Sequence, residues 1–236
     1  MIFDVFSERI RNKNIDNFLQ KNCCPDYLSC FLLSQMVDKN LSILELDYLF
    51  VDIETSGFNS ESDSILSIGW VCIIGGTLDI STSSHYYIKP YRESVNFTNS
   101  VIHHIVPDML VNGIEIDLAL FEMFTLAQGK KIVVHGACVE ANFFSDYFKR
   151  KYHLNKVPII YLDTILIEKY FCKKYRTIED FRLSITRKRY QLYDSMSHNA
   201  LIDSISTAEL FLCQVERLKR LNVKSIGELC WISMVM

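Results

Sequence analysis

Residues 48–57 read Tyr48-Leu49-Phe50-Val51-Asp52-Ile53-Glu54-Thr55-Ser56-Gly57, an apolar run of β-strand character that ends in two carboxylates and a Thr-Ser-Gly turn. Side chains alternate between the two faces of a strand, so Asp52 and Glu54 point the same way. Two neighbouring carboxylates near the end of a buried strand repel each other and lose hydration. A divalent cation offsets these costs best, and ligands that are all oxygen favour Mg²⁺ or Mn²⁺ over Zn²⁺.

The spacing of Asp52 and Glu54 does not establish a metal site by itself. Asp-x-Glu is a common pair, and a strand that simply reaches solvent at Asp52 is the better explanation of the spacing alone. The prediction of a metal site therefore depends on whether later stretches supply matching partners.

The residues that follow predict a mixed sheet flanked by helices. Residues 65–74 and 85–90 have strand character, and Gly75-Gly76 between them is a hairpin turn signal. With the first strand they form an antiparallel meander. Two more strands then alternate with helices, which indicates an α/β fold. These strands are expected at 131–135 and 158–162, and helices at 117–127, 138–151, 164–172, 178–190 and 198–218.

Residues 1–46 are expected to form an N-terminal helical extension. Their apolar residues are spaced loosely as a helical stripe before Pro25, and a second apolar helix follows it. Packing against the main domain explains the extension most simply, and an arm that binds a partner is the alternative. The main domain is predicted at 47–220 and a C-terminal tail at 221–236.

The composition predicts a cytoplasmic globular protein. The 236 residues suffice for one sizeable α/β domain, and a formal net charge of −3 argues against a strongly basic protein that coats nucleic acid. An enzyme that holds phosphates through metal ions needs less basic surface. The eight cysteines form no Cys-x-x-Cys pair, so free thiols are expected. Neither a signal peptide nor a membrane span is expected.

Later stretches place polar side chains at the ends of predicted strands and helices. Glu140 lies in the first turn of a helix, where it also favours the helix dipole. Asp163 ends a strand and is expected to cap the next helix. His198 and Asp203 would diverge by roughly 140° on one continuous helix. They share a site only if His198 precedes the helix and Asp203 lies in an early turn.

Taken together and in order, these pieces resemble the DEDDh family of 3′→5′ exonucleases. That family has an RNase H-like fold and includes the proofreading epsilon subunit of bacterial replicative DNA polymerase. The resemblance covers roughly residues 47–215. It is carried by residues 51–57, 102–105, 133–144, 162–164, 198–203 and 207–210.

One departure from the family pattern concerns residue 140. The family usually has Asp there, whereas this chain has Glu140, which is one methylene longer. Glu is still a competent hard-oxygen ligand. Asp146 lies on the same helix, but six residues on it points to a different face, so Glu140 is the favoured ligand.

The resemblance implies that two Mg²⁺ or Mn²⁺ ions support hydrolysis of a terminal phosphodiester, with release of nucleoside 5′-monophosphates. Asp52 would bridge both ions, with His198 as the general base. The implied metal ligands are Asp52, Glu54, Glu140 and Asp203. The implied substrate-binding residues are Thr55, Ser56, Gly57, Phe58, His103 and His135, among which Phe58 would stack on the terminal base.

Three functions remain open from the sequence. The leading hypothesis is a metal-dependent exonuclease that acts mainly on the 3′ end of single-stranded DNA. An exoribonuclease that trims RNA or oligonucleotides is the close alternative, because sequence does not show contacts to a 2′-OH. A catalytically weak nucleic-acid-binding module, associated with a DNA polymerase, is the third. A basic stretch at residues 173–189 either tracks a nucleic-acid backbone or forms a solvated helix face.

Overall fold

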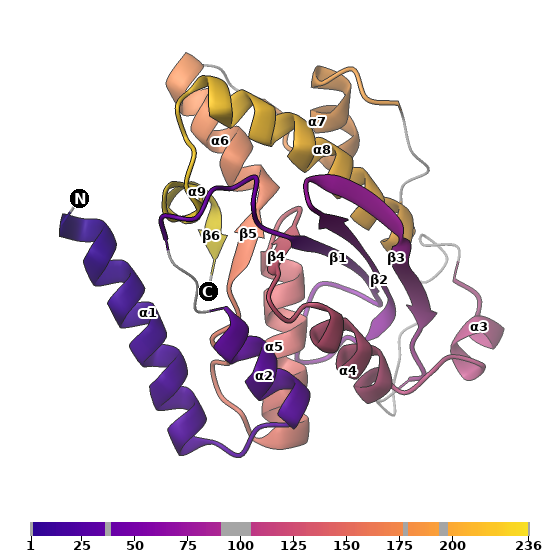
Figure 1. Ribbon diagram of the computed structural model, residues 1–236. Helices are drawn as coiled ribbons and strands as arrows, with labels where there is room; N and C mark the ends of the chain where they lie inside the picture. Colours follow the sequence, from indigo (N-terminus) through magenta and orange to yellow (C-terminus); the bar gives the residue numbers. More distant parts are fainter. Residues whose placement is uncertain (1, 36–38, 91–104, 177–178, 194–197, 236) are drawn as a thin grey trace.

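The chain is built on one mixed β-sheet (Figure 1). The computed structural model describes residues 2–35, 39–90, 105–176, 179–193 and 198–235. Within these residues six strands lie in the order β3-β2-β1-β4-β5-β6. They are β1 (Tyr48–Thr55), β2 (Ile65–Ile74), β3 (Thr77–Tyr87), β4 (Lys131–Val134), β5 (Tyr161–Asp163) and β6 (Met234–Val235).

The pairing of the strands confirms the predicted mixed sheet. β1 pairs antiparallel with β2, and β2 with β3, which makes the expected meander. β4 and β5 run parallel to β1, and β6 pairs antiparallel with β5. β3 begins at Thr77 rather than at the predicted residue 85. The predicted start is wrong because the polar residues between them pair with β2 as an edge strand, without an apolar pattern to mark them.

Helices cover both faces of the sheet (Figure 1). One core cluster joins β1 to α2, α4 and α5, and a second joins the other face to α6, α8 and α9. The helices are α1 (Ile2–Lys21), α2 (Asp26–Ser34), α3 (Pro107–Val111), α4 (Ile116–Leu126), α5 (Cys138–Tyr152), α6 (Thr164–Tyr175), α7 (Leu183–Arg189), α8 (Ala200–Arg220) and α9 (Ile226–Ser233). None of these helices combines the length and the apolar character that a membrane span requires.

The alternation of β1 side chains decides where its carboxylates point. Leu49 and Val51 belong to the cluster with α4 and α5, whereas Phe50 belongs to the cluster with α8. Because successive side chains take opposite faces, Asp52 and Glu54 lie on the same side as Phe50. The α8 side of the sheet therefore carries the acidic residues.

The N-terminal extension packs against the main domain through α2. Leu28 and Phe31 are fully buried, and the ring of Phe31 lies 5.0 Å from the ring of Phe124 in α4. α1 is anchored by the buried Ile15, while Figure 1 shows it running along the outside of the molecule. These contacts favour packing as one role of the extension.

The segment predicted as a C-terminal tail contributes to the sheet. Ser225 and Glu228 form a capping box that starts α9, in which each side chain bonds the backbone of the other residue. Met234 of β6 then pairs with Leu162 of β5. The domain limits at 46/47 and 220/221 stay predictions.

Candidate metal centre and active site

The structure brings three of the predicted ligands together. Asp52, Glu54 and Asp203 each offer a carboxylate oxygen, and these oxygens all lie within 4.8 Å of one another. Glu54 is buried, and the other two side chains are half-buried. We call these three residues the acid cluster. Such a set of hard oxygen ligands suits a small divalent cation.

Asp203 reaches β1 because α8 packs very closely on the sheet. Gly69 of β2 stands directly opposite Asp52, and a Cβ at Gly69 would collide with the backbone of Leu201 at the start of α8. The hydroxyl of Ser204 donates to the carbonyl of Gly69 at 2.7 Å. Because Gly69 has no side chain, the first turn of α8 lies directly on β2, next to Asp52 of β1.

His198 lies just before α8, as a shared site with Asp203 requires. Its φ of 69° is in the left-handed region, and its backbone N–H donates to Oδ2 of Asp203 at 2.9 Å. Asn199 then caps the helix by accepting the N–H groups of Leu201 and Ile202. The entry to α8 therefore ties the backbone of His198 to a carboxylate of the acid cluster, with the imidazole exposed.

The carboxylates oppose one another's ionisation. Burial raises the pKa of Asp52 well above its usual range, and the nearby carboxylates of Glu140, Asp203 and Glu54 raise it further. Burial also raises the pKa of Asp203, although the bond from the backbone N–H of His198 offsets part of the shift. A bound cation reverses this cost, so the residues present fit a divalent metal.

Glu140 lies beside the acid cluster without belonging to the group of three. Its side chain is 3% exposed, and its Oε2 has no hydrogen-bond partner among the described residues. Burial raises its pKa to about 8, with Asp163 and Glu54 adding to the shift. A buried carboxylate oxygen without a partner is costly, and a cation would satisfy it. Asp146, the alternative ligand, instead forms an ion pair with Arg150 at 2.9 Å.

Asp163 is a helix cap, as predicted. Its carboxylate accepts the N–H of Ile165 in the first turn of α6 at 2.8 Å. The same carboxylate accepts the N–H groups of Gly136 and Ala137, both at 3.0 Å. Asp163 thereby joins the end of β4 to the start of α6, next to Glu140.

Both ring nitrogens of His135 have partners within the protein. Nδ1 lies 2.7 Å from Oγ1 of Thr164, and Nε2 lies 2.7 Å from the carbonyl oxygen of Phe181. Burial lowers the pKa of this imidazole, which favours a neutral ring that donates to Phe181. Its predicted place in the substrate cleft stays a prediction. His103, the other histidine predicted there, lies outside the described residues.

The turn after β1 is fixed by its own polar groups. Thr55 donates its hydroxyl proton to the carbonyl of Gly57 at 2.7 Å, and Ser56 donates to Asp63 at 3.1 Å. A Cβ at Gly57 would collide with the Asp63 carboxylate, so a larger residue there would displace the group that accepts from Ser56. Phe58 follows with its side chain 92% exposed. The turn thus presents an aromatic ring to solvent next to Glu54.

Sequence reasoning missed His85 of β3. Asp52 stands opposite Gly69, and Gly69 stands opposite His85, so all three lie on one face of the sheet. Its Nε2 is buried without a hydrogen-bond partner in the described parts of the chain. Burial lowers its pKa, and Glu54 partly opposes the shift. No motif marks His85, because only the pairing of three strands brings it near the acid cluster.

Part of the basic stretch is used inside the fold. Arg187 is 4% exposed and lies 2.8 Å from the carboxylate of Glu209. Arg189 lies 3.4 Å from the buried carboxylate of Glu168. These two arginines hold α7 against α6 and α8. The other basic residues of the stretch are exposed: Lys173, Lys174, Arg176, Arg182 and Lys188.

Comparison with known sequences places the chain among exonucleases. A family model described as "Exonuclease" (RNase_T) matches residues 49–211. The PolC-type DNA polymerase III of Thermotoga maritima is 30% identical over 183 residues, which are 77% of this chain and 13% of that protein. The PolC-type enzyme of Mycoplasmopsis pulmonis is 28% identical over 192 residues, 79% of this chain and 13% of that one. The chain thus matches about an eighth of these relatives.

Solved structures share the fold. Cell-death related nuclease 4 superposes with a TM-score of 0.61 at 13% identity, covering 76% of this chain and 65% of that one. E. coli Exonuclease I in complex with a dT13 oligonucleotide gives 0.60 at 17% identity, covering 75% and 42%. The nuclease domain of 3′hExo, a DEDDh family member bound to rAMP, gives 0.60 at 15% identity, covering 75% and 95%. The predicted RNase H-like fold is confirmed.

Proposed function

Because this chain belongs to the RNase_T exonuclease family, we propose that it is a metal-dependent 3′→5′ exonuclease that acts mainly on single-stranded DNA. The observation that carries the proposal is the acid cluster, whose oxygens lie within 4.8 Å of one another at the end of β1. A binding module has no need to bury carboxylates that raise one another's pKa. The family and the cluster together favour phosphodiester hydrolysis.

The proposed metal ligands are Asp52, Glu54, Asp203 and Glu140. All four are carboxylates, which suit Mg²⁺ or Mn²⁺, and the unpartnered Oε2 of Glu140 supports its inclusion. When bound, two such ions neutralise the charge that develops on the attacking and leaving oxygens. The ligands also explain how a chain with a net charge of −3 can act on a polyanion.

His198 is the proposed general base. Imidazole is the side chain that most often acts as a general base in enzymes. The backbone N–H of the same residue is bonded to Asp203, which keeps His198 next to the acid cluster. It would take a proton from the attacking water while the water oxygen bonds to phosphorus. The bond from phosphorus to the 3′ oxygen of the preceding nucleotide breaks, and that oxygen takes up a proton. The products are a nucleoside 5′-monophosphate and a shortened strand.

The turn after β1 is the proposed site of the terminal nucleotide. Thr55, Ser56 and Gly57 are held in place by internal hydrogen bonds and by Asp63. Phe58, which is 92% exposed, would stack on the terminal base without reading its identity. His103 and His135 stay proposed cleft residues.

A polymerase-linked role is a second proposal. It is favoured by the 30% identity to part of a PolC-type DNA polymerase III. In that role the chain would remove nucleotides from the primer end as a proofreader. An exoribonuclease remains the alternative, because the solved relatives include one bound to a dT13 oligonucleotide and one bound to rAMP.

The test is digestion of single-stranded DNA and RNA oligonucleotides, labelled at either end, with Mn²⁺. Stepwise shortening from the 3′ end is expected for the native protein and not for Asp52→Ala. Asp146→Ala is the matched control, since this carboxylate is occupied by Arg150. The ratio of DNA to RNA rates ranks the two substrates. If neither polymer is cleaved, the exonuclease proposal is rejected and a nucleic-acid-binding module is favoured.

A further inference from the structure

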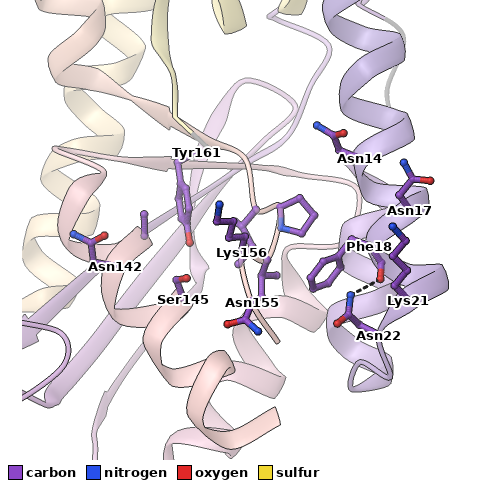
Figure 2. Close-up of a pocket in the computed structure, with 14 residues that line it drawn as sticks. Asn14, Asn17, Phe18, Lys21, Asn22, Asn142, Ser145, Asn155, Lys156 and Tyr161 are labelled. Carbon is purple, nitrogen blue, oxygen red and sulfur yellow. Dashed lines mark hydrogen bonds between the residues drawn. The ribbon is translucent and has the colours of Figure 1, made fainter. Parts of the chain in front are cut away.

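A cavity of about 700 Å³ lies between α1 and the main domain, away from the acid cluster. Figure 2 shows side chains of α1 on one side, those of α5 on the other, and Asn155 and Lys156 between them. Its volume is in the range of ~300–1,000 Å³ that ligand sites occupy. We call it the asparagine groove. The polar residues that define it are Asn14, Asn17, Lys21, Asn142, Asn155 and Lys156.

The charge of the asparagine groove is opposite to that of the acid cluster. Its lining holds two lysines, and among the described residues that line it there is no Asp or Glu. The whole chain has 28 acidic residues against 25 lysines and arginines. A surface without carboxylates in such a chain disfavours a cation and favours an anionic ligand.

The fold uses Asn22, which also lines the asparagine groove: its Nδ2 donates to the carbonyl oxygen of Phe18 at 2.8 Å. The side chains of Lys21 and Lys156 form no ion pair or hydrogen bond with any described residue, and the same holds for the side chains of Asn142 and Asn155. By contrast, Lys151 on the same α5 is paired with Asp117 at 3.3 Å. The side chains of Lys21, Lys156, Asn142 and Asn155 are therefore available to a ligand without breaking an internal contact.

The chemistry of the lining fits single-stranded nucleic acid better than a simple anion. A bare phosphate needs only donors, whereas each asparagine amide also offers an acceptor, as base edges require. Phe18 at the wall is half-buried and adds an aromatic face, on which a base can stack. Lysines, amides and an aromatic ring together are the groups that hold a strand without reading its sequence.

The asparagine groove also lies within reach of a strand that ends in the acid cluster. Glu140 and Asn142 are two residues apart on α5, about 200° around the helix, so they point to opposite faces. Glu140 faces the acid cluster and Asn142 lines the groove. One helix, about 10–12 Å across with its side chains, separates the two sites.

We propose that the asparagine groove is a second, non-catalytic site for single-stranded nucleic acid. It holds a part of the strand that lies upstream of the 3′ end in the acid cluster, and it gives α1 a function beyond packing. This inference rests on the proposed function, because it assumes that a strand end enters the acid cluster.

Binding of a fluorescent oligo(dT) in the presence of EDTA tests the groove separately from catalysis. Without metal the acid cluster repels phosphates, so binding reports the cationic surface. We expect Lys21→Glu/Lys156→Glu to bind the oligonucleotide at least about tenfold more weakly. Its salt dependence should fall by about 1.4 in slope, as expected for two lost lysine contacts to a single strand. Asn142→Ala/Asn155→Ala should weaken binding without any change of charge.

The matched control is Lys173→Glu/Lys174→Glu, which makes the same change of charge at exposed lysines of α6. This control should bind like the native protein. Three results would overturn the inference. The groove variant could bind oligo(dT) as tightly as the native protein, or the control could lose as much affinity as the groove variant. A poly-glutamate peptide serves as a second probe, and a loss of affinity for this peptide alone would show a general anion site. Cleavage of a dinucleotide in Mn²⁺ should stay unchanged in the groove variant. If the native protein does not cleave the dinucleotide, the proposed function is rejected instead.

Discussion

Two buried carboxylates of this protein are equally shielded from water and differ in their partners. Glu140 is 3% exposed and Glu168 is 2% exposed. The carboxylate of Glu168 accepts hydrogen bonds from the hydroxyl of Tyr190 and from the amide of Gln214 at 2.8 Å. It also forms an ion pair with the guanidinium of Arg189 at 3.4 Å. Glu140 keeps one oxygen without a partner among the described residues and has carboxylates as neighbours.

The contrast shows that burial alone does not mark a functional carboxylate. In the Glu168 network (Glu168, Arg189, Tyr190 and Gln214) both carboxylate oxygens of Glu168 have partners, so the network stabilises the packing of α6, α7 and α8. Glu140 keeps an unpartnered oxygen beside carboxylates that repel it, which is the condition expected where a cation binds. Removing a carboxylate should therefore have opposite consequences in the two regions.

Asp52→Asn should produce the largest effect. The change removes a proposed metal ligand, so the cleavage rate should fall on the order of 10³-fold or more. It also removes one of the mutually repelling charges, so the metal-free protein should melt at a higher temperature than the native one. Activity assays and thermal unfolding in EDTA measure the two parts. A variant that is both active and less stable would break the comparison.

Glu168→Ala should destabilise the fold by about 3–5 kcal/mol, the typical cost of breaking a buried ion pair. The loss leaves Arg189 and Tyr190 without their shared partner, and urea unfolding measures it. Glu179→Ala is the matched control, because it removes the half-exposed second partner of Arg189 and should cost no more than about 1 kcal/mol. Equal losses in both variants would show that the Glu168 network adds nothing beyond a surface pair.

The sequence predicted the elements that depend on local patterns. The β1 strand, the Asp-x-Glu pair and the cap at Asp163 follow from alternation and capping preferences of neighbouring residues. The sequence did not predict the Glu168 network, because the partners of Glu168 lie 21 to 46 positions from it along the chain. His85 escaped for the same reason, since the edge strand that carries it has no apolar pattern. Side chains that meet only through tertiary packing produce no pattern among neighbouring residues of the sequence, so they are not predicted from it.

The pH dependence of stability separates the two regions further. Burial raises the pKa of Glu140 to about 8 from an ordinary value of 4.5. Between these values the folded state holds a proton that the unfolded state releases, so stability is highest at low pH in this window and falls as the pH rises toward 8. At ~1.4 kcal/mol for each pH unit, we expect the loss across the full window to approach about 5 kcal/mol in EDTA.

Urea unfolding at several pH values in EDTA measures this loss. Glu140→Gln should flatten the curve, and Mn²⁺ should do the same to the native protein because a cation favours the charged carboxylate. A flat curve for the metal-free native protein would show that Glu140 is already ionised and partnered.

Glu140→Asp gives the smallest and sharpest contrast. It installs the residue that the DEDDh pattern usually has, yet apolar residues of α5 and β1 belong to one core cluster, so the two backbones should stay in place when the side chain shortens. Shortening by one methylene should draw the carboxylate away from the acid cluster, so Mn²⁺ affinity measured by calorimetry should fall by no more than about tenfold, or ~1.4 kcal/mol. Glu168→Asp should cost stability and leave Mn²⁺ affinity unchanged. Tighter binding in Glu140→Asp would mean that the longer side chain weakens the site, and that the extra methylene serves packing rather than the metal.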